Sequence, residues 1–209
     1  MARTVGSSGP KTAQSIREAG LRLIYRHGYE AMSLRQLGTE VGIQSGSLYN
    51  HIASKQALLV EIVLDHMQTL IARLDAALDG VEGPAARLEA FCRLHLTYHM
   101  TRRAEVVIAN MELRSLEPDN RAAAVALRDA YESRLTDILR EGAACGQFHI
   151  EDARVTTFAI IAMLTGICMW YRPDGPRSQE ELIAIHTELA MRSVTGGQAG
   201  GMGSRPSRL

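Results

Sequence analysis

The stretch SLRQLGTEVGIQSGSLYNHIASKQALL, residues 33–59, constrains the fold of this 209-residue chain more than any other. Ser33 and Gln36 have the spacing of a capping box, which begins a helix, and Gly42 suits the residue that ends one. Only Gly42 and Ile43 separate this helix from the polar stretch that follows. The sequence therefore predicts two short helices joined by a tight turn.

The second of these helices is expected at about residues 44–51, and few of its side chains suit a protein core. Its only strongly apolar members, Leu48 and Ile52, are four residues apart, so it can bury one narrow edge. The other residues are small or polar. Because the major groove of DNA is about 12 Å wide, small residues permit close approach to the base pairs. The two helices have the pattern of a helix-turn-helix.

Side chains in and around this pair have chemistry that suits DNA. Tyr49 can reach a backbone oxygen, and Asn50 and His51 can donate to phosphates or base edges. Lys55 can hold a phosphate without reading sequence, and Arg35 can pair with guanine through two hydrogen bonds. A surface helical hairpin with solvated polar residues is the alternative interpretation of the same pattern.

Apolar stripes of helical period cover the rest of the chain, and no stretch alternates like a β-strand. Ser54 can cap a long helix, and Ser178 with Glu181 forms a second capping box. Helices are expected at residues 12–28, 33–42, 44–51, 54–78, 84–101, 104–116, 118–146, 152–172 and 178–194. The predicted fold class is all-α.

Charge is distributed unevenly, although the chain as a whole is neutral. Residues 1–55 hold seven Lys or Arg against three Asp or Glu, as expected when one end faces phosphates.

Cys92, Cys145 and Cys168 are odd in number and widely spaced, which suits a reducing compartment. Residues 155–171 carry no charge, but 17 positions fall short of the about 20 that span a membrane. With no signal peptide recognised, we expect a buried helix there and a cytoplasmic protein without membrane contact.

Residues 32–59 closely resemble the DNA-binding domain of the TetR family of transcriptional repressors. The resemblance rests on Gly42, Gly46, Ser47-Leu48-Tyr49, Ser54-Lys55 and Ala57-Leu58-Leu59. It implies a homodimer of all-helical subunits that binds a double-stranded DNA operator through three N-terminal helices. It also implies a larger C-terminal domain for ligand binding and dimerisation.

Carried onto this chain, the family's DNA contacts fall on Ser33, Arg35, Ser45, Ser47, Tyr49, Asn50, His51 and Lys55. Ser45 departs from the Lys or Pro common in the family, and Ile52 from the common Phe. The expected organisation is a flexible arm (1–10), a DNA-binding domain (11–55), a ligand-binding and dimerisation domain (56–195) and a disordered tail (196–209).

The C-terminal part is similar, more loosely, to TetR-type regulators of fatty-acid, sterol and acyl-CoA catabolism, through NMELRSLEPDNR (110–121) and MWYRPDGPRSQEEL (169–182). This resemblance implies an acyl-CoA thioester as the effector, held by an apolar tunnel with cations at its mouth. The candidate ligand-binding residues are Met67, Phe91, His95, His99, Met111, Arg114, Phe158, Met163 and Trp170, with Arg102, Arg103 and Arg128 as further cations. Apolar residues at helical spacing are more often simply core, which is the alternative for each of them.

His95 and His99 are four residues apart on the stripe that holds Cys92, a spacing that can chelate a metal. The zinc-protease helix has a Glu after its first His, and this chain does not, so we expect histidines that line a pocket or bond within the core. No catalytic motif is recognisable, and we expect neither an enzyme nor a cofactor. A helical acyl-ligand carrier, a small helical enzyme and an activator remain alternatives to a repressor.

The helices at 152–172 and 178–194 are the expected dimer surface, since two from each subunit would pack as a four-helix bundle. The alternative places the 152–172 helix at the centre of the monomer. Dimerisation meets a mechanical requirement, because two recognition helices held about 34 Å apart read a palindrome.

Overall fold

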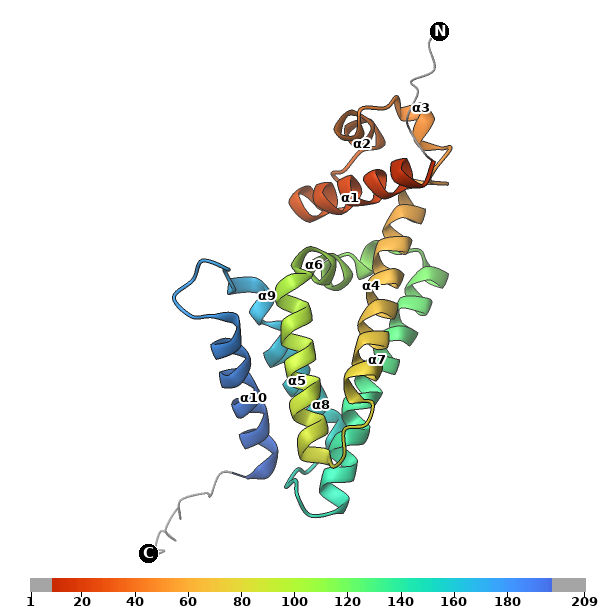
Figure 1. Ribbon diagram of the computed structural model, residues 1–209. Coiled ribbons are helices and arrows are strands. Elements are labelled where there is room, and N and C mark those ends of the chain that lie inside the picture. Colours follow the sequence, from red (N-terminus) through yellow and green to blue (C-terminus); the bar gives the residue numbers. More distant parts are fainter. Residues whose placement is uncertain (1–8, 197–209) are drawn as a thin grey trace, which may run out of the picture. The chain divides into compact units, whose positions relative to one another are not determined.

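A computed structural model describes residues 9–196 of the chain (Figure 1). Within that range every regular element is a helix, which confirms the all-α prediction. The elements are α1 (Gly9–His27), α2 (Leu34–Val41), α3 (Ser45–Leu48), α4 (Lys55–Leu78), α5 (Pro84–Thr101), α6 (Arg103–Met111), the 3-10 turn η1 (Leu113–Ser115), α7 (Pro118–Ala144), α8 (Ala153–Thr165), α9 (Ile167–Trp170) and α10 (Gln179–Thr195).

The described chain divides into two compact units. The N-terminal unit comprises residues 9–73 and 98–131, and the C-terminal unit comprises residues 74–97 and 132–196. Each has its own packing and is described by itself.

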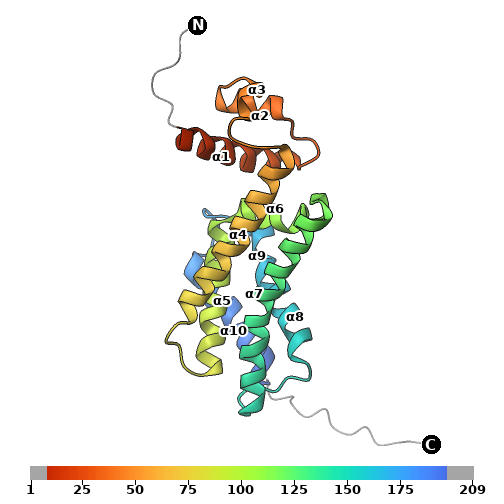
Figure 2. The same ribbon diagram turned by 90° about the vertical axis from the view of Figure 1, so that its right-hand side faces the viewer.

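The N-terminal unit is built around α1. This helix packs against α2 and α6, and both views place it between the α2–α3 pair and α6 (Figures 1 and 2). Ile16 of α1 and Leu59 of α4 are fully buried in one apolar cluster with Leu37 and Leu48. At Gly20 a Cβ would lie 2.6 Å from Leu58 Cδ2, so a side chain there would displace this leucine where α1 meets α4.

The C-terminal unit is held by contacts from α5 and α7 to the last helices. Arg93 on α5 pairs with Glu180 at the start of α10 (2.8 Å). The buried hydroxyls of Thr136 and Thr157 join α7 to α8 (2.9 Å). This unit also contains most of the large apolar side chains that remain exposed.

Most helix ends agree with the sequence, and four differ. The third helix, expected at 44–51, is one turn (Ser45–Leu48) followed by further turns. The helix expected at 104–116 ends at Met111, and the one expected at 152–172 is interrupted at Gly166. Gly9 and Pro10 belong to α1 and not to the arm expected at 1–10, while residues 1–8 and the tail from 197 lie outside the described residues.

One helical stretch, Ala153–Trp170, is long and apolar enough to cross a membrane by length and composition alone. Only 28% of it is buried in the structure, so the expectation of a buried helix is wrong for this chain taken alone.

Candidate nucleic-acid interface and effector pocket

The N-terminus of α2 is fixed by the predicted capping box. Gln36 N donates to Ser33 Oγ (3.2 Å), and Ser33 N donates to Gln36 Oε1 (2.9 Å). These bonds satisfy two backbone donors that a helix end leaves without partners. Arg35 lies exposed in the first turn, and its guanidinium has no partner within residues 9–196.

The turn between α2 and α3 depends on two glycines. Gly42 has φ 75° and ψ 27°, the left-handed conformation that ends a helix at little cost for glycine. Gly42 N donates to Thr39 O (3.2 Å) and Ile43 N to Gly38 O (2.9 Å), the two bonds of a Schellman motif. At Gly38 a Cβ would lie 2.8 Å from Ile43 O, so this glycine lets the turn close. Nothing in the sequence alone indicated the role of Gly38.

The recognition segment (residues 45–51) buries one narrow edge, as predicted, and its other residues are exposed or half-buried. Leu48 is fully buried and Ile52 nearly so, whereas the Tyr49 side chain is 59% exposed. At Gly46 a Cβ would meet no atom within 4 Å. The other predicted DNA-contacting residues of the segment are Ser45 and His51, which are half-buried, and Ser47 and Asn50, which are exposed.

Lys55 has contacts that the sequence did not indicate. Its Nζ donates to Glu30 O (3.2 Å) and lies 4.3 Å above the centroid of the buried Tyr29 ring. One donor and the cation–π contact hold the ammonium in place, and two N–H groups remain for a phosphate.

The predicted effector residues divide between the two units. Met67, His99, Met111 and Arg114 belong to the N-terminal unit, where the first two are buried and the last two exposed. The other five, in the C-terminal unit, are Phe91 and His95, both buried, Met163, half-buried, and Phe158 and Trp170, exposed.

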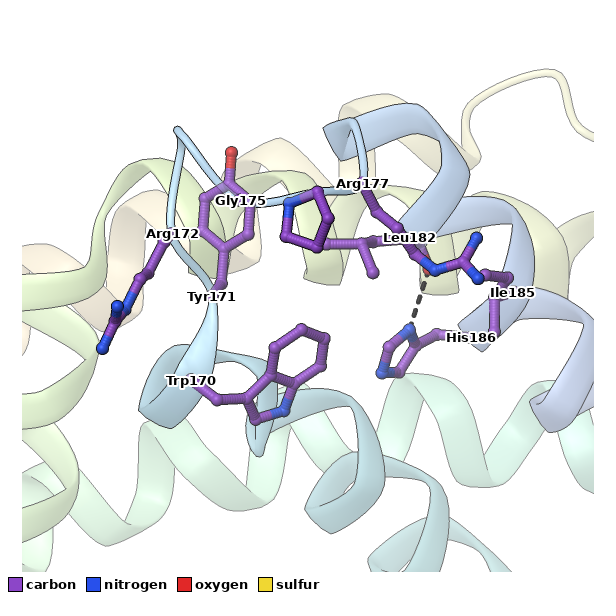
Figure 3. A pocket seen from close by; sticks show the side chains of 9 residues that line it. Trp170, Tyr171, Arg172, Gly175, Arg177, Leu182, Ile185 and His186 are labelled. Atoms are coloured by element: carbon purple, nitrogen blue, oxygen red, sulfur yellow. Dashed lines mark hydrogen bonds between the residues drawn. The ribbon is translucent and has the colours of Figure 1, made fainter.

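Trp170 lines a pocket of about 430 Å³ between the end of α9 and the first turns of α10. Its ring faces that of His186 at 5.9 Å with an interplanar angle of 23° (Figure 3). Arg172 and Arg177 lie on opposite sides of this pair in Figure 3. The pocket thus combines aromatic faces with two guanidinium groups. Arg172, Arg177 and His186 were not predicted from the sequence, although RPDGPR begins two residues after the tryptophan.

One ring nitrogen of His186 has a defined role. His186 Nδ1 lies 2.8 Å from Leu182 O, and because a carbonyl only accepts, Nδ1 carries the proton. In the neutral ring Nε2 is then left as an acceptor for a ligand donor.

Comparison with known proteins decides the family. The sequence model described as "Bacterial regulatory proteins, tetR family" matches residues 16–62, and that described as "Tetracyclin repressor-like, C-terminal domain" matches residues 81–194. Together they cover both units. The chain belongs to the TetR family.

Individual relatives agree with this assignment. The chain is 28% identical to the HTH-type transcriptional repressor KstR2 of Mycolicibacterium smegmatis over 82% of its own length and 84% of the relative. The solved TetR-family regulator PfmR of Thermus thermophilus is 34% identical with a TM-score of 0.77, covering 85% of this chain and 97% of that one. AibR, solved with isovaleryl coenzyme A and operator DNA, is 26% identical with a TM-score of 0.78, covering 85% and 97%. This TetR-family chain is a DNA-binding transcriptional regulator and not an enzyme.

His95 and His99 of this TetR-family chain are both buried. His95 Nε2 lies 3.1 Å from Thr165 Oγ1, and its ring packs beside Phe91. Burial, with a smaller effect from Glu89, raises the pKa of the Cys92 thiol to about 12, which disfavours the thiolate that a metal needs. Among residues 9–196 no three His, Cys, Asp or Glu side chains gather as a metal site would require.

A second buried polar group lies in the N-terminal unit. Tyr98 Oη lies 3.3 Å from His66 Nδ1, in a buried contact between α5 and α4. Burial first, and then the positive charges of Arg128 and Arg102, lower the pKa of His66 to about 4. The two arginines predicted as cations for an effector therefore lie near a buried, neutral imidazole.

Proposed function

We propose that the protein is a repressor that binds a palindromic operator as a homodimer and is released by an acyl-CoA. The observation that carries the DNA-binding half is the recognition segment itself. Its outward side presents Gly46, Tyr49 and Asn50, and Arg35 of α2 adds a guanidinium without a partner in the described residues. This surface has the size and polarity that a major groove accepts.

The dimer surface in this proposal is the exposed apolar side of the last three helices. Large side chains that stay exposed there are Val155, Phe158, Met169 and Leu189, beside Trp170 and Ile185, which line the Trp170 pocket. Such a concentration on one part of a protein is characteristic of an interaction surface. Two copies joined here would hold two recognition segments for successive major grooves, about 34 Å apart.

The effector half of the proposal draws on the Trp170 pocket. An acyl-CoA has an adenine ring, which stacks on aromatic faces, and phosphates, which pair with guanidinium groups. Trp170, His186, Arg172 and Arg177 supply both kinds of partner. The relative AibR was solved with isovaleryl coenzyme A, which supports a thioester of this class.

Release follows from unequal affinity of the effector for two forms of the dimer. In the proposed mechanism the effector favours a form in which α4 swings and the recognition segments no longer match the operator. Coupling between two sites is typically about 1–3 kcal/mol, or about 5- to 150-fold in affinity. Because its proposed target is an operator on DNA, we place the protein in the cytoplasm.

Fluorescence anisotropy tests the proposal. The purified protein is titrated onto a duplex from upstream of its own gene and onto a scrambled duplex, at two salt concentrations, with and without a panel of acyl-CoAs and free coenzyme A. We expect binding to the native duplex alone and release by one thioester. Specific binding that no thioester disturbs would remove the effector assignment, and equal binding to both duplexes would remove the operator assignment.

A further inference from the structure

The segment after α6 fixes a carboxylate with its own hydrogen bonds. Glu112 N donates to Ile108 O (2.8 Å), which ends α6, and Ser115 N donates to Glu112 O (2.9 Å) in η1. Ser115 Oγ donates to the carboxylate oxygen Glu112 Oε2 (2.8 Å). One oxygen of Glu112 is therefore oriented by its own segment.

The other oxygen reaches the turn that follows α1. Tyr29 N donates to Glu112 Oε1 (3.0 Å). Gly28 has φ 81°, and a Cβ there would lie 3.5 Å from this same oxygen. Because the chain leaves the helix at Gly28, the Tyr29 N–H needs an acceptor outside α1. A carboxylate makes a stronger hydrogen bond here than a neutral group would.

This turn holds Lys55. The Tyr29 ring lies under the Lys55 ammonium, and the carbonyl of Glu30 accepts from it. The two groups that hold the ammonium, the Tyr29 ring and the Glu30 carbonyl, therefore lie next to the Tyr29 N–H, which donates to the Glu112 carboxylate. From the other side, Gln56 Nε2 donates to Ser115 O (3.0 Å), so the same short segment also holds the first turn of α4.

We propose that Glu112 is a positioning residue for DNA binding, which fixes the Tyr29–Glu30 turn and through it the Lys55 ammonium. The proposal rests on the proposed function. Glu112 is not itself a DNA contact, because its charge repels phosphate and both oxygens already accept hydrogen bonds. Its loss should therefore weaken DNA binding, although removing a negative charge near DNA by itself favours binding.

Two conservative variants separate position from charge. Glu112→Gln keeps an oxygen acceptor at the same reach and loses the charge. Glu112→Asp keeps the charge and is one methylene too short to reach Tyr29 N. For the native duplex, we expect the Gln variant to bind within about threefold of wild type and the Asp variant about tenfold more weakly. The opposite order would show that Glu112 acts through charge and would overturn the proposal.

Glu117 offers a matched control. Its charge acts on Tyr29, as that of Glu112 does, but its carboxylate makes no hydrogen bond within the described residues. Glu117→Gln removes the same charge and should leave binding unchanged or slightly stronger. Thermal unfolding of each variant shows that it is folded at the temperature of the titration.

The salt dependence identifies Lys55 as the group that is positioned. Lys55→Ala should flatten the slope of log affinity against log salt by about one unit. Glu112→Asp should flatten the slope similarly. In the Lys55→Ala background it should weaken DNA binding by less than about a further twofold, because both changes remove the same phosphate contact. Ser115→Ala, which frees Oε2 without touching the core, serves the same test if the Asp variant does not fold.

Additive losses, or a loss of affinity with an unchanged salt slope, would overturn the proposal. A wild-type protein that binds native and scrambled duplexes equally would instead overturn the proposed function on which it rests.

Discussion

Two glycines of the helix-turn-helix differ in what requires them. A Cβ at Gly38 would lie 2.8 Å from the carbonyl oxygen of Ile43, so the fold itself excludes a side chain there. A Cβ at Gly46 would meet nothing within 4 Å, and glycine weakens a helix by about 1 kcal/mol relative to alanine. Since nothing inside the unit needs glycine at 46, we expect the missing side chain to serve close approach to DNA.

The Gly46→Ala variant should therefore gain stability and lose operator affinity. Stability should rise by about 0.5–1 kcal/mol, and affinity for the native duplex should fall about tenfold because the methyl group blocks the approach. Thermal unfolding and anisotropy measure the two effects. Gly38→Ala is the control and should lose stability. Unchanged affinity at Gly46→Ala would show that this surface does not approach DNA.

Tyr49 contributes a side chain that the fold does not use. It is 59% exposed, so Tyr49→Ala should leave unfolding unchanged and weaken operator binding about tenfold, as expected for a lost contact in the interface. Tyr25, also exposed but on α1, provides the matched control, and Tyr25→Ala should bind as wild type. Equal effects of the two substitutions on operator affinity would contradict the assignment of residues 45–51 as the recognition segment.

At the scale of helices, ends set by neighbouring residues could be predicted and ends set by distant ones could not. The capping boxes at Ser33 and Ser178 are both formed, because their partners lie three residues away. The end of α6 at Met111 was missed, since the next residue, Glu112, reaches Tyr29 across 83 positions. The break at Gly166 lies in a charge-free stretch. Because no charged face marks the register of a helix there, hydrophobic periodicity could not locate the break.

The contact between α4 and α5 at His66 predicts a pH dependence of stability. The pKa of His66 is about 4 in the folded protein against 6.5 for a free imidazole, so the unfolded chain binds the extra proton. Stability is therefore complete above about pH 6.5 and is lost as the pH falls toward 4, by about 3 kcal/mol in total for this group. The free energy of unfolding falls with decreasing pH because the pKa of this histidine is lower in the folded protein than in the unfolded chain.

Denaturant unfolding between pH 7 and pH 4.5 checks this expectation. The free energy of unfolding of His66→Gln should fall less steeply with decreasing pH than that of wild type, because glutamine cannot take up the proton. His27, exposed at the end of α1, gives the control variant His27→Gln. Parallel curves for wild type and His66→Gln would contradict the buried, neutral histidine.

At the scale of the whole molecule, the sequence indicated the family but not the ligand site. Local motifs identify a helix-turn-helix, whereas a pocket is assembled from residues that no spacing rule connects. Four of the nine predicted ligand residues fall in one unit and five in the other, and among these five Trp170 lines the pocket with His186. Hydrophobicity could not distinguish core positions such as Phe91 from exposed ones such as Phe158.

The exposed apolar side of α8–α10 gives the prediction for assembly. Phe158→Arg should place a charge in the dimer surface and raise the dimer dissociation constant about 100-fold or more, since a buried unpaired charge is costly. Operator affinity should fall with it, because a monomer reads one half-site. Light scattering after size exclusion measures the mass, and Val125→Arg, at an exposed apolar site on α7, is the control. A dimeric Phe158→Arg protein would place the interface elsewhere.

The contacts of Lys55 with Tyr29 and Glu30 also affect the entropy of DNA binding. A free lysine loses rotamer freedom when it meets a phosphate, at a cost of about 0.5–1.5 kcal/mol for each immobilised side chain. In this protein the hydrogen bond to Glu30 O and the contact with the Tyr29 ring have already restricted the side chain. That entropy is lost during folding, so the phosphate contact of Lys55 should be more favourable than that of an unrestrained surface lysine.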